Sequence, residues 1–153
     1  MELYLLRHGI AEDRSPDGSD EARRLTEDGR ARLEATKAGL ARLRVRPERL
    51  LTSPLVRARQ TAQIVGAHLG LAPEVAEALA PGCRSEHILG LLAERLGSGA
   101  VLAVGHEPDL SQIVLAITGA RCEMKKGALA RIDLAPGAAH GTLTFLVPPR
   151  GLR

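Results

Sequence analysis

Arg7-His8-Gly9 is the segment of this chain whose residue types are best suited to chemistry, and it directly follows the apolar run Leu3–Leu6. Arginine presents a planar fork of N–H donors that matches a phosphate group. Histidine is a competent nucleophile near neutral pH, and glycine lets the backbone come close to an anion. Because the apolar run is typical of a buried strand, the tripeptide lies at a strand end. The sequence therefore predicts a place where a phosphoryl group is held and attacked.

Two further groups of polar residues follow apolar segments later in the chain. Ser53-Pro54 comes directly after Arg49–Thr52, with Arg57 soon afterwards, and His106 closely follows Ala100–Val104. In open α/β sheets, ligands bind outside the carboxyl ends of the strands. We therefore expect both arginines and both histidines to converge on one pocket, to which the N-termini of the following helices add positive potential.

Alternating strand and helix patterns predict the elements that position these residues. Short apolar runs predict strands at Glu2–Leu6, Arg49–Thr52, Glu74–Ala78, Ala100–Val104, Ala128–Leu134 and Thr142–Val147. Apolar residues at helical spacing predict one helix after Thr26 that carries Leu33, Leu40 and Leu43, one from Ser53-Pro54 to Gly70, one over Ser85–Leu96 with Leu96 facing inward, and one starting at Pro108. Thr26 and Ser53 are expected to act as N-caps, with Pro54 at a first helical position.

This alternation predicts one α/β domain over residues 1–153, built as a three-layer α/β/α sandwich around a mostly parallel sheet. The last two strands are joined through Pro136-Gly137 and are expected to form a hairpin that adds antiparallel character at one edge. A long polar loop over Gly9–Arg24 is expected between the first strand and the first helix.

Composition narrows the class of protein. The chain is 44% hydrophobic and 25% charged, and no apolar run approaches the roughly 20 residues of a membrane span. Arg7 interrupts the first apolar run too early for a secretory signal, so we expect a cytoplasmic protein without membrane contact. The net charge of +3 comes mostly from arginines interleaved with acidic residues, and only 1% of residues are aromatic, which argues against nucleic-acid binding. Cys83 and Cys122 lack metal-site spacing and are expected to be reduced thiols.

Four segments together resemble the histidine phosphatase superfamily, which has the phosphoglycerate mutase-like fold, and within it the SixA-type phosphohistidine phosphatases. These segments are Arg7-His8-Gly9, Leu25–Gly29, Ser53–Thr61 and Gly105–Pro108. The resemblance covers nearly the whole chain, in order and in spacing. It implies metal-independent dephosphorylation through a phosphohistidine enzyme intermediate, without a cofactor.

The resemblance also implies a role for each matched residue. His8 is the expected nucleophile, Arg7 and Arg57 the expected clamp on the phosphoryl oxygens, and His106 a hydrogen-bond donor as charge builds up. Gly9, Ser53 and Arg23 are the expected substrate-binding residues, although Arg23 could equally be a solvated loop charge. His106-Glu107 does not have the spacing of two metal ligands on a helix face, so no metal site is expected.

The general acid stays open, because the glutamate-rich loop of the mutases is missing. Glu77, Glu86 and Glu107 are conceivable proton donors, and none matches the superfamily pattern cleanly. A leaving imidazole, with a pKa near ~6.5, needs less help than an alkoxide, which favours phosphohistidine as substrate. The expected partner is a phosphohistidine-bearing signalling or phosphotransfer protein, acted on by a monomer. The alternatives are a phosphatase for small phosphomonoesters and, more remotely, a non-catalytic phosphate- or nucleic-acid-binding module.

Overall fold

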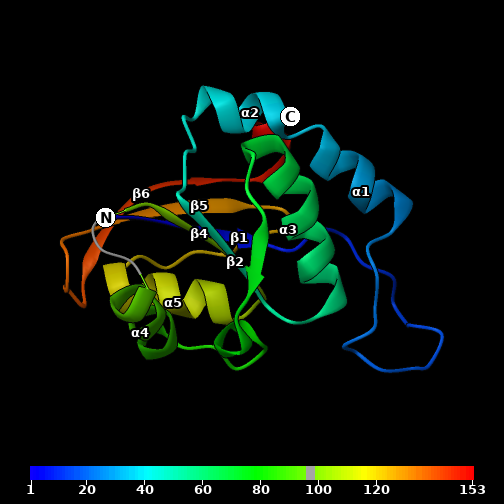
Figure 1. Cartoon of the computed structure of the whole chain (residues 1–153), viewed down its shortest axis with the longest axis horizontal. Coiled ribbons are helices and arrows are strands. Elements are labelled where there is room, and N and C mark those ends of the chain that lie inside the picture. The colour runs from blue at the N-terminus through cyan, green and yellow to red at the C-terminus, as the bar shows by residue number, and fades with distance from the viewer. Residues whose placement is uncertain (96–98) are drawn as a thin grey trace.

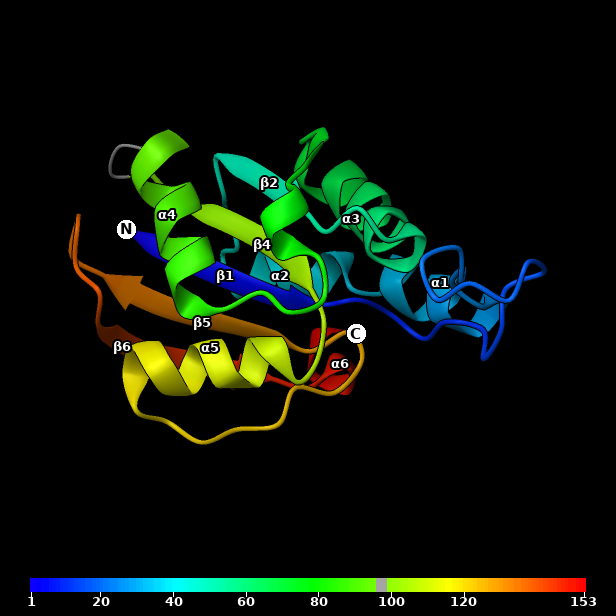
Figure 2. The same ribbon diagram turned by 90° about the horizontal axis from the view of Figure 1, so that it is seen from below.

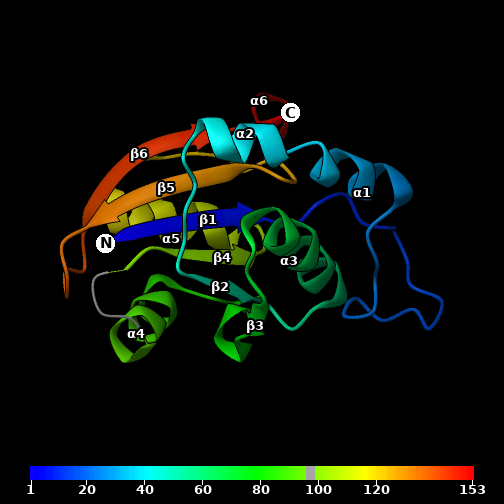
Figure 3. The ribbon, with the colours of Figure 1, turned by 45° about the horizontal axis from the view of Figure 1, so that its top comes forward.

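The protein folds around one six-stranded sheet in the order β3-β2-β4-β1-β5-β6, which Figure 3 shows face on. The structure is a computed structural model that describes residues 1–95 and 99–153. The strands are β1 (Glu2–Arg7), β2 (Arg49–Thr52), β3 (Pro73–Val75), β4 (Val101–Gly105), β5 (Leu129–Leu134) and β6 (Gly141–Val147).

Most of the sheet is parallel, as predicted. Strands β1, β2, β3 and β4 pair in parallel, whereas β5 runs antiparallel to both of its neighbours, β1 and β6. The expected hairpin of the last two strands is therefore confirmed. Because β1, β4 and β2 are adjacent and point the same way, their carboxyl ends lie side by side along one edge of the sheet.

Helices cover both faces of the sheet, which confirms the three-layer sandwich (Figures 1 and 2). The helices are α1 (Glu27–Glu34), α2 (Lys37–Arg42), α3 (Val56–Leu69), the 3₁₀ helix η1 (Glu77–Leu79), α4 (Ser85–Arg95), α5 (Asp109–Thr118) and α6 (Pro149–Leu152). Alternate residues of β1 point to opposite faces: Leu3 and Leu5 pack toward α4 and α5, and Tyr4 and Leu6 toward the layer of α1, α2, α3 and α6. None of the helices in the described part of the chain is long and apolar enough to span a membrane.

The helix expected after Thr26 is two helices, α1 and α2, rather than one. Thr26 does cap α1, because its Oγ1 accepts from the Gly29 N–H at 2.9 Å. At the break, the Thr36 N–H bonds to the Leu33 carbonyl three residues back, and the Thr36 hydroxyl donates to the same carbonyl at 2.7 Å. These bonds tighten the chain locally, since an uninterrupted α-helix pairs each N–H with the carbonyl four residues back.

The prediction that Ser53 and Pro54 open a helix is wrong. Helix α3 begins at Val56, and its N-cap residue is Leu55, whose apolar side chain makes no capping hydrogen bond. Ser53 lies before the helix, and its hydroxyl serves the functional site described below. The end of α3 is as expected, because Gly70 adopts the left-handed conformation with φ of 71°.

Smaller differences concern element ends. The strand expected over Glu74–Ala78 is the shorter β3, followed by the 3₁₀ helix η1, and the short C-terminal helix α6 was not predicted. Helix α5 begins at Asp109, one residue after Pro108. The expected inward position of Leu96 falls outside the described residues.

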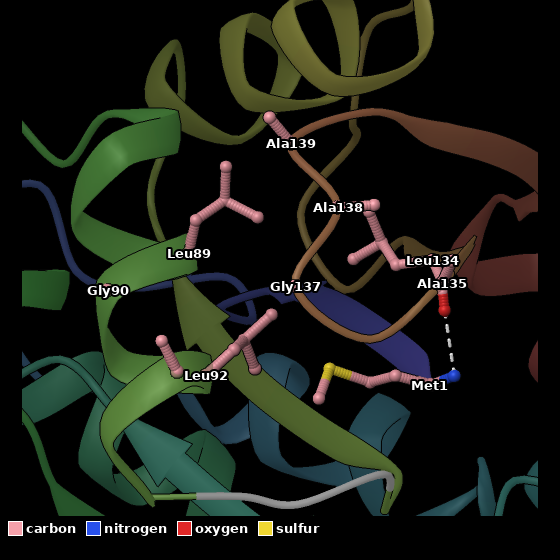
Figure 4. Close-up of a pocket in the computed structure, with 10 residues that line it drawn as sticks. Met1, Leu89, Gly90, Leu92, Leu134, Ala135, Gly137, Ala138 and Ala139 are labelled. Atoms are coloured by element: carbon pink, nitrogen blue, oxygen red, sulfur yellow. Dashed lines mark hydrogen bonds between the residues drawn. The ribbon is translucent and has the colours of Figure 1, made fainter.

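The amino edge of the sheet carries a hollow of about 520 Å³ between α4 and the turn that joins β5 to β6. Figure 4 shows Leu89 and Leu92 of α4 facing Met1 and Leu134 across it. The rest of the lining is mostly alanine and glycine from the turn, so this hollow offers apolar surface and few polar groups.

Candidate active site

Four of the predicted residues meet at the carboxyl edge of the sheet. Arg7 ends β1 and His8 follows it, His106 follows the adjacent strand β4, and Arg57 lies in the first turn of α3. His8, Arg57 and His106 are nearly inaccessible to solvent, with 5%, 6% and 4% of their surfaces exposed. Polar side chains this deeply buried are rare unless they are paired or have a functional role. Their convergence is the central feature of this edge.

The His8 ring is fixed by a backbone carbonyl. Its Nδ1 lies 2.7 Å from the Gly9 carbonyl oxygen, which can only accept, so Nδ1 carries the proton. The lone pair is then on Nε2, which faces the Arg57 Nε–H at 3.3 Å. Burial, together with the nearby His106, Arg57 and Arg7, lowers the pKa of His8 to about 3. His8 is therefore neutral at physiological pH, and its unprotonated Nε2 accepts a hydrogen bond from Arg57 Nε–H.

His106 is oriented by Ser53, a fully buried residue at the end of β2. The Ser53 Oγ lies 2.7 Å from His106 Nε2, and no other acceptor for the Ser53 hydroxyl is found within the described residues. The hydroxyl therefore donates to Nε2, which places the imidazole proton of His106 on Nδ1. Burial and the Arg57 charge lower the pKa of His106 to about 4, so this ring is also neutral. The two imidazole rings lie 5.2 Å apart.

Two buried side-chain nitrogens at this edge have no hydrogen-bond partner. Among the side chains that the structure describes (residues 1–94 and 99–153), Arg7 Nε and His106 Nδ1 are the only buried polar atoms in this state. Each carries an N–H donor, and a buried donor without a partner costs free energy. Both belong to residues at the same edge of the sheet as His8. The geometry therefore supplies unused donors beside a nucleophilic nitrogen, as an anion site requires.

The two arginines are held in different ways. Arg7 donates from Nη1 to the Met124 carbonyl at 2.9 Å, and burial lowers its pKa, although a guanidinium stays charged. Arg57 donates from Nη1 to the Asp20 carbonyl at 2.8 Å and from Nη2 to the Asp20 carboxylate at 3.1 Å. Asp20 was not singled out in the sequence, because only the fold brings this loop against the start of α3.

Gly9 supports the site through packing and one backbone bond. Its N–H donates to the Thr61 hydroxyl at 3.0 Å, and that hydroxyl donates to the Arg57 carbonyl at 2.8 Å. A Cβ atom at Gly9 would lie 2.8 Å from the end of the Leu33 side chain, so a larger residue would require Leu33 to move. The Gly9 amide is thus already used within the protein. Thr61 was missed as a site residue, although its spacing of four from Arg57 places both on one face of α3.

The remaining predicted residues lie around the rim. Arg23 donates from Nε to the Glu12 carbonyl at 2.7 Å and from Nη1 to the Asp20 carboxylate at 2.9 Å, so it joins the site through Asp20. Glu107 accepts from the backbone and hydroxyl of Ser111, at the start of α5. Glu77 lies on η1 beyond β3 at the outer end of the same edge, and it is exposed.

Comparisons with known proteins agree on the class. The family model of the histidine phosphatase superfamily (branch 1) matches residues 3–81. An uncharacterised protein of Picosynechococcus sp. is 41% identical over 92% of this chain and 88% of its own length. The phosphohistidine phosphatase SixA of Escherichia coli is 30% identical over 100% of this chain and 97% of its own. The structure of the protein histidine phosphatase SixA complexed with tungstate superposes with a TM-score of 0.85 at 29% identity, covering 100% of both chains.

The match to the solved SixA structure extends over the whole α/β sandwich, whose carboxyl edge carries the buried histidines and arginines in this chain. The chain belongs to the histidine phosphatase superfamily and is of the SixA type. It is therefore an enzyme that acts on a phosphorylated substrate, as the sequence predicted.

Proposed function

We propose that this phosphatase removes phosphoryl groups from phosphohistidine on a signalling or phosphotransfer protein, through a phosphoryl group carried on His8. The observation that carries the proposal is the pair of unpartnered buried donors, Arg7 Nε and His106 Nδ1, beside the His8 Nε2 lone pair. A tetrahedral oxyanion placed against Nε2 would give both donors a partner. The tungstate bound to the related SixA protein is an oxyanion of this kind.

In the first step, the His8 Nε2 lone pair attacks the phosphorus atom and an N–P bond forms. The bond from phosphorus to the leaving group breaks, and its electron pair goes to that group. Arg57 and Arg7 bind the non-bridging oxygens, and the His106 Nδ1–H donates to one of them as negative charge develops. The Gly9 carbonyl keeps the proton on His8 Nδ1, so the new phosphoimidazole stays in the same orientation.

In the second step, water attacks the phosphorus atom of phosphoryl-His8. The N–P electron pair returns to His8 Nε2, the water proton leaves with inorganic phosphate, and the neutral imidazole is restored. The buried environment that lowers the pKa of His8 to about 3 keeps it neutral and ready for the next cycle. Charge neutralisation by the arginines fits a reaction that uses no metal ion.

The choice of phosphohistidine rests on the proton donors. Glu107 already binds Ser111, and Glu77 is exposed at the outer end of the edge. The imidazole of a phosphohistidine can carry a proton on its other ring nitrogen, since an imidazole is protonated with a pKa near ~6.5, and it then leaves as a neutral ring without a strong acid nearby. An alkoxide needs a proton from a well-placed acid. The relation to the E. coli phosphohistidine phosphatase SixA points in the same direction.

A small-molecule phosphomonoesterase is the second candidate, and Glu77 is the observation that favours it. This carboxyl lies at the same edge of the sheet as His8, and it makes no side-chain hydrogen bond within the described residues. A carboxylic acid there could protonate an ester oxygen when a substrate brings that oxygen close.

One kinetic comparison distinguishes the two candidate functions. A phosphohistidine peptide and a phosphoserine peptide of otherwise identical sequence would be assayed with wild type and with Glu77→Gln. We expect a higher kcat/KM for the phosphohistidine peptide than for the phosphoserine peptide. Wild type and Glu77→Gln should cleave the phosphohistidine peptide at the same rate. Faster cleavage of the phosphoserine peptide, lost in Glu77→Gln, would instead establish the esterase.

A further inference from the structure

Asp20 is an acidic residue whose side chain contacts two arginines, Arg57 and Arg23. Its Oδ2 accepts from Arg57 Nη2 at 3.1 Å, and its Oδ1 accepts from Arg23 Nη1 at 2.9 Å. Its backbone carbonyl also accepts from Arg57 Nη1 at 2.8 Å. One residue thus holds Arg57 at two points and joins it to Arg23. Within the described part of the chain, no other carboxylate makes an ion pair with Arg57.

These contacts divide the donors of Arg57 into two sets. A guanidinium has two forks, one made by Nη1 and Nη2 and one made by Nε and Nη2. Asp20 takes the first fork with its carbonyl and carboxylate oxygens. The second fork faces His8, because Arg57 Nε lies 3.3 Å from His8 Nε2. The fork that is left for phosphoryl oxygens is therefore the one beside the nucleophile.

The loop that carries Asp20 is itself tied to the fold. The Val56 N–H at the start of α3 donates to the Glu21 carbonyl at 3.0 Å. Arg23 reaches back to the Glu12 carbonyl across the loop, and an antiparallel bridge joins Ala11 to Leu25 at its base. The side chain of Asp20 is 54% exposed, so it contributes little to the core. Its hydrogen bonds indicate instead that it orients Arg57 and Arg23.

We propose that Asp20 is a positioning residue that holds Arg57 with its Nε–Nη2 fork toward His8 and couples Arg23 to the same clamp. This inference rests on the function proposed above. A carboxylate beside an anion site repels a bound phosphate, so Asp20 weakens ground-state binding. What it provides is alignment in the transition state, and alignment affects turnover more than affinity.

The test compares kcat with the affinity for inorganic phosphate. Wild type, Asp20→Asn and the control Glu21→Gln would be assayed with para-nitrophenyl phosphate, using phosphate as competitive inhibitor. Glu21 is the neighbouring exposed carboxylate, so its variant removes the same charge from the same loop. An asparagine keeps one acceptor oxygen but turns N–H donors toward the other arginine. We expect kcat of Asp20→Asn to fall by about 10- to 100-fold, with phosphate bound as tightly as by wild type or more tightly.

A kcat within twofold of the Glu21→Gln value would overturn the proposal. So would a parallel loss of kcat and phosphate affinity, because that pattern shows that Asp20 only holds the loop in place. Arg23→Gln in both backgrounds tests the coupling: its effect on kcat should be smaller in Asp20→Asn than in wild type. Equal effects in the two backgrounds would contradict the link. These readouts are ratios to a working wild type, whereas failure of the proposed function shows as a wild type that forms no phosphoenzyme.

Discussion

The two ends of the sheet differ in what they offer a ligand. The amino edge has the hollow of about 520 Å³ in Figure 4, lined by Leu89, Leu92, Met1 and Leu134 with small residues of the turn. The carboxyl edge instead gathers buried His8, Arg57 and His106, together with the two unpartnered donors. The first end therefore offers apolar space, and the second offers the reactive and charged groups.

The difference teaches that volume alone does not locate the active site of this protein. An apolar hollow arises wherever a helix and a turn of small residues do not fill the space between them. Buried imidazole and guanidinium groups, by contrast, lose their hydration, and a buried donor without a partner costs about 1–3 kcal/mol. The proposed function accounts for such groups at the carboxyl edge, because a bound oxyanion would give both donors a partner.

Arg57→Lys is expected to have the largest effect among substitutions that keep the charge at the carboxyl edge. An ammonium cannot present a planar fork to the phosphoryl oxygens or to Asp20. We expect kcat/KM to fall by roughly 100-fold in steady-state assays. Arg59→Lys, an exposed position on the same helix, is the matched control and should keep wild-type activity. Full activity of Arg57→Lys would remove Arg57 from the site.

Ser53→Ala should have an intermediate effect. The variant removes the hydroxyl that donates to His106 Nε2, so the proton of His106 is no longer held on Nδ1. We expect kcat to fall by about 10-fold, with the pattern of imidazole tautomers visible as changed ¹⁵N shifts of His106. Thr52→Val removes the neighbouring buried hydroxyl and should change neither quantity. An unchanged ¹⁵N spectrum of His106 in Ser53→Ala would refute the assigned tautomer.

Leu92→Ala should leave activity unchanged, because Leu92 lies at the amino edge of the sheet and not at the carboxyl edge. Leu92 is 4% exposed beside the hollow at the amino edge. Its truncation should lower the free energy of unfolding by about 2–4 kcal/mol, measured by urea denaturation. The kcat/KM of the folded protein should stay within twofold of wild type. A large loss of kcat/KM in this variant would show that the two ends of the sheet are coupled.

The sequence predicted the fold well where the pattern is local and strong. The predicted strand Arg49–Thr52 coincides with β2, and the run Ala100–Val104 differs from β4 by one residue at each end. Both strands have a neighbour on each side of the sheet, and the residues in their middle are apolar and buried, so neighbouring elements do not change their character. Element boundaries that depend on weaker local preferences differ more between prediction and structure. At Thr36, for example, side-chain and backbone hydrogen bonds to Leu33 divide the expected helix in two.

The site was predictable to the extent that its residues follow strands. Arg7, His8 and His106 could be placed at one edge because β1 and β4 are adjacent and parallel. Ser53 was wrongly predicted to be an N-cap. A serine before a proline is typical of an N-cap, and the sequence does not show that its hydroxyl instead bonds to His106. Asp20 was missed because the polar loop contains several acidic residues, and only the folded loop places this one against Arg57, 37 residues away. Contacts of that kind have no signature in sequence spacing.

The measurement that tests the account most directly is a rapid-quench search for phosphoryl-His8. Wild type and His8→Ala would be mixed with a phosphohistidine peptide in excess chelator, quenched in alkali, and analysed by mass spectrometry for the modified residue. The account predicts an acid-labile phosphoryl group on His8 in wild type, and neither this group nor turnover in a His8→Ala protein that remains folded by circular dichroism. Turnover by wild type without any phosphoryl group on His8, or continued turnover by His8→Ala, would contradict it.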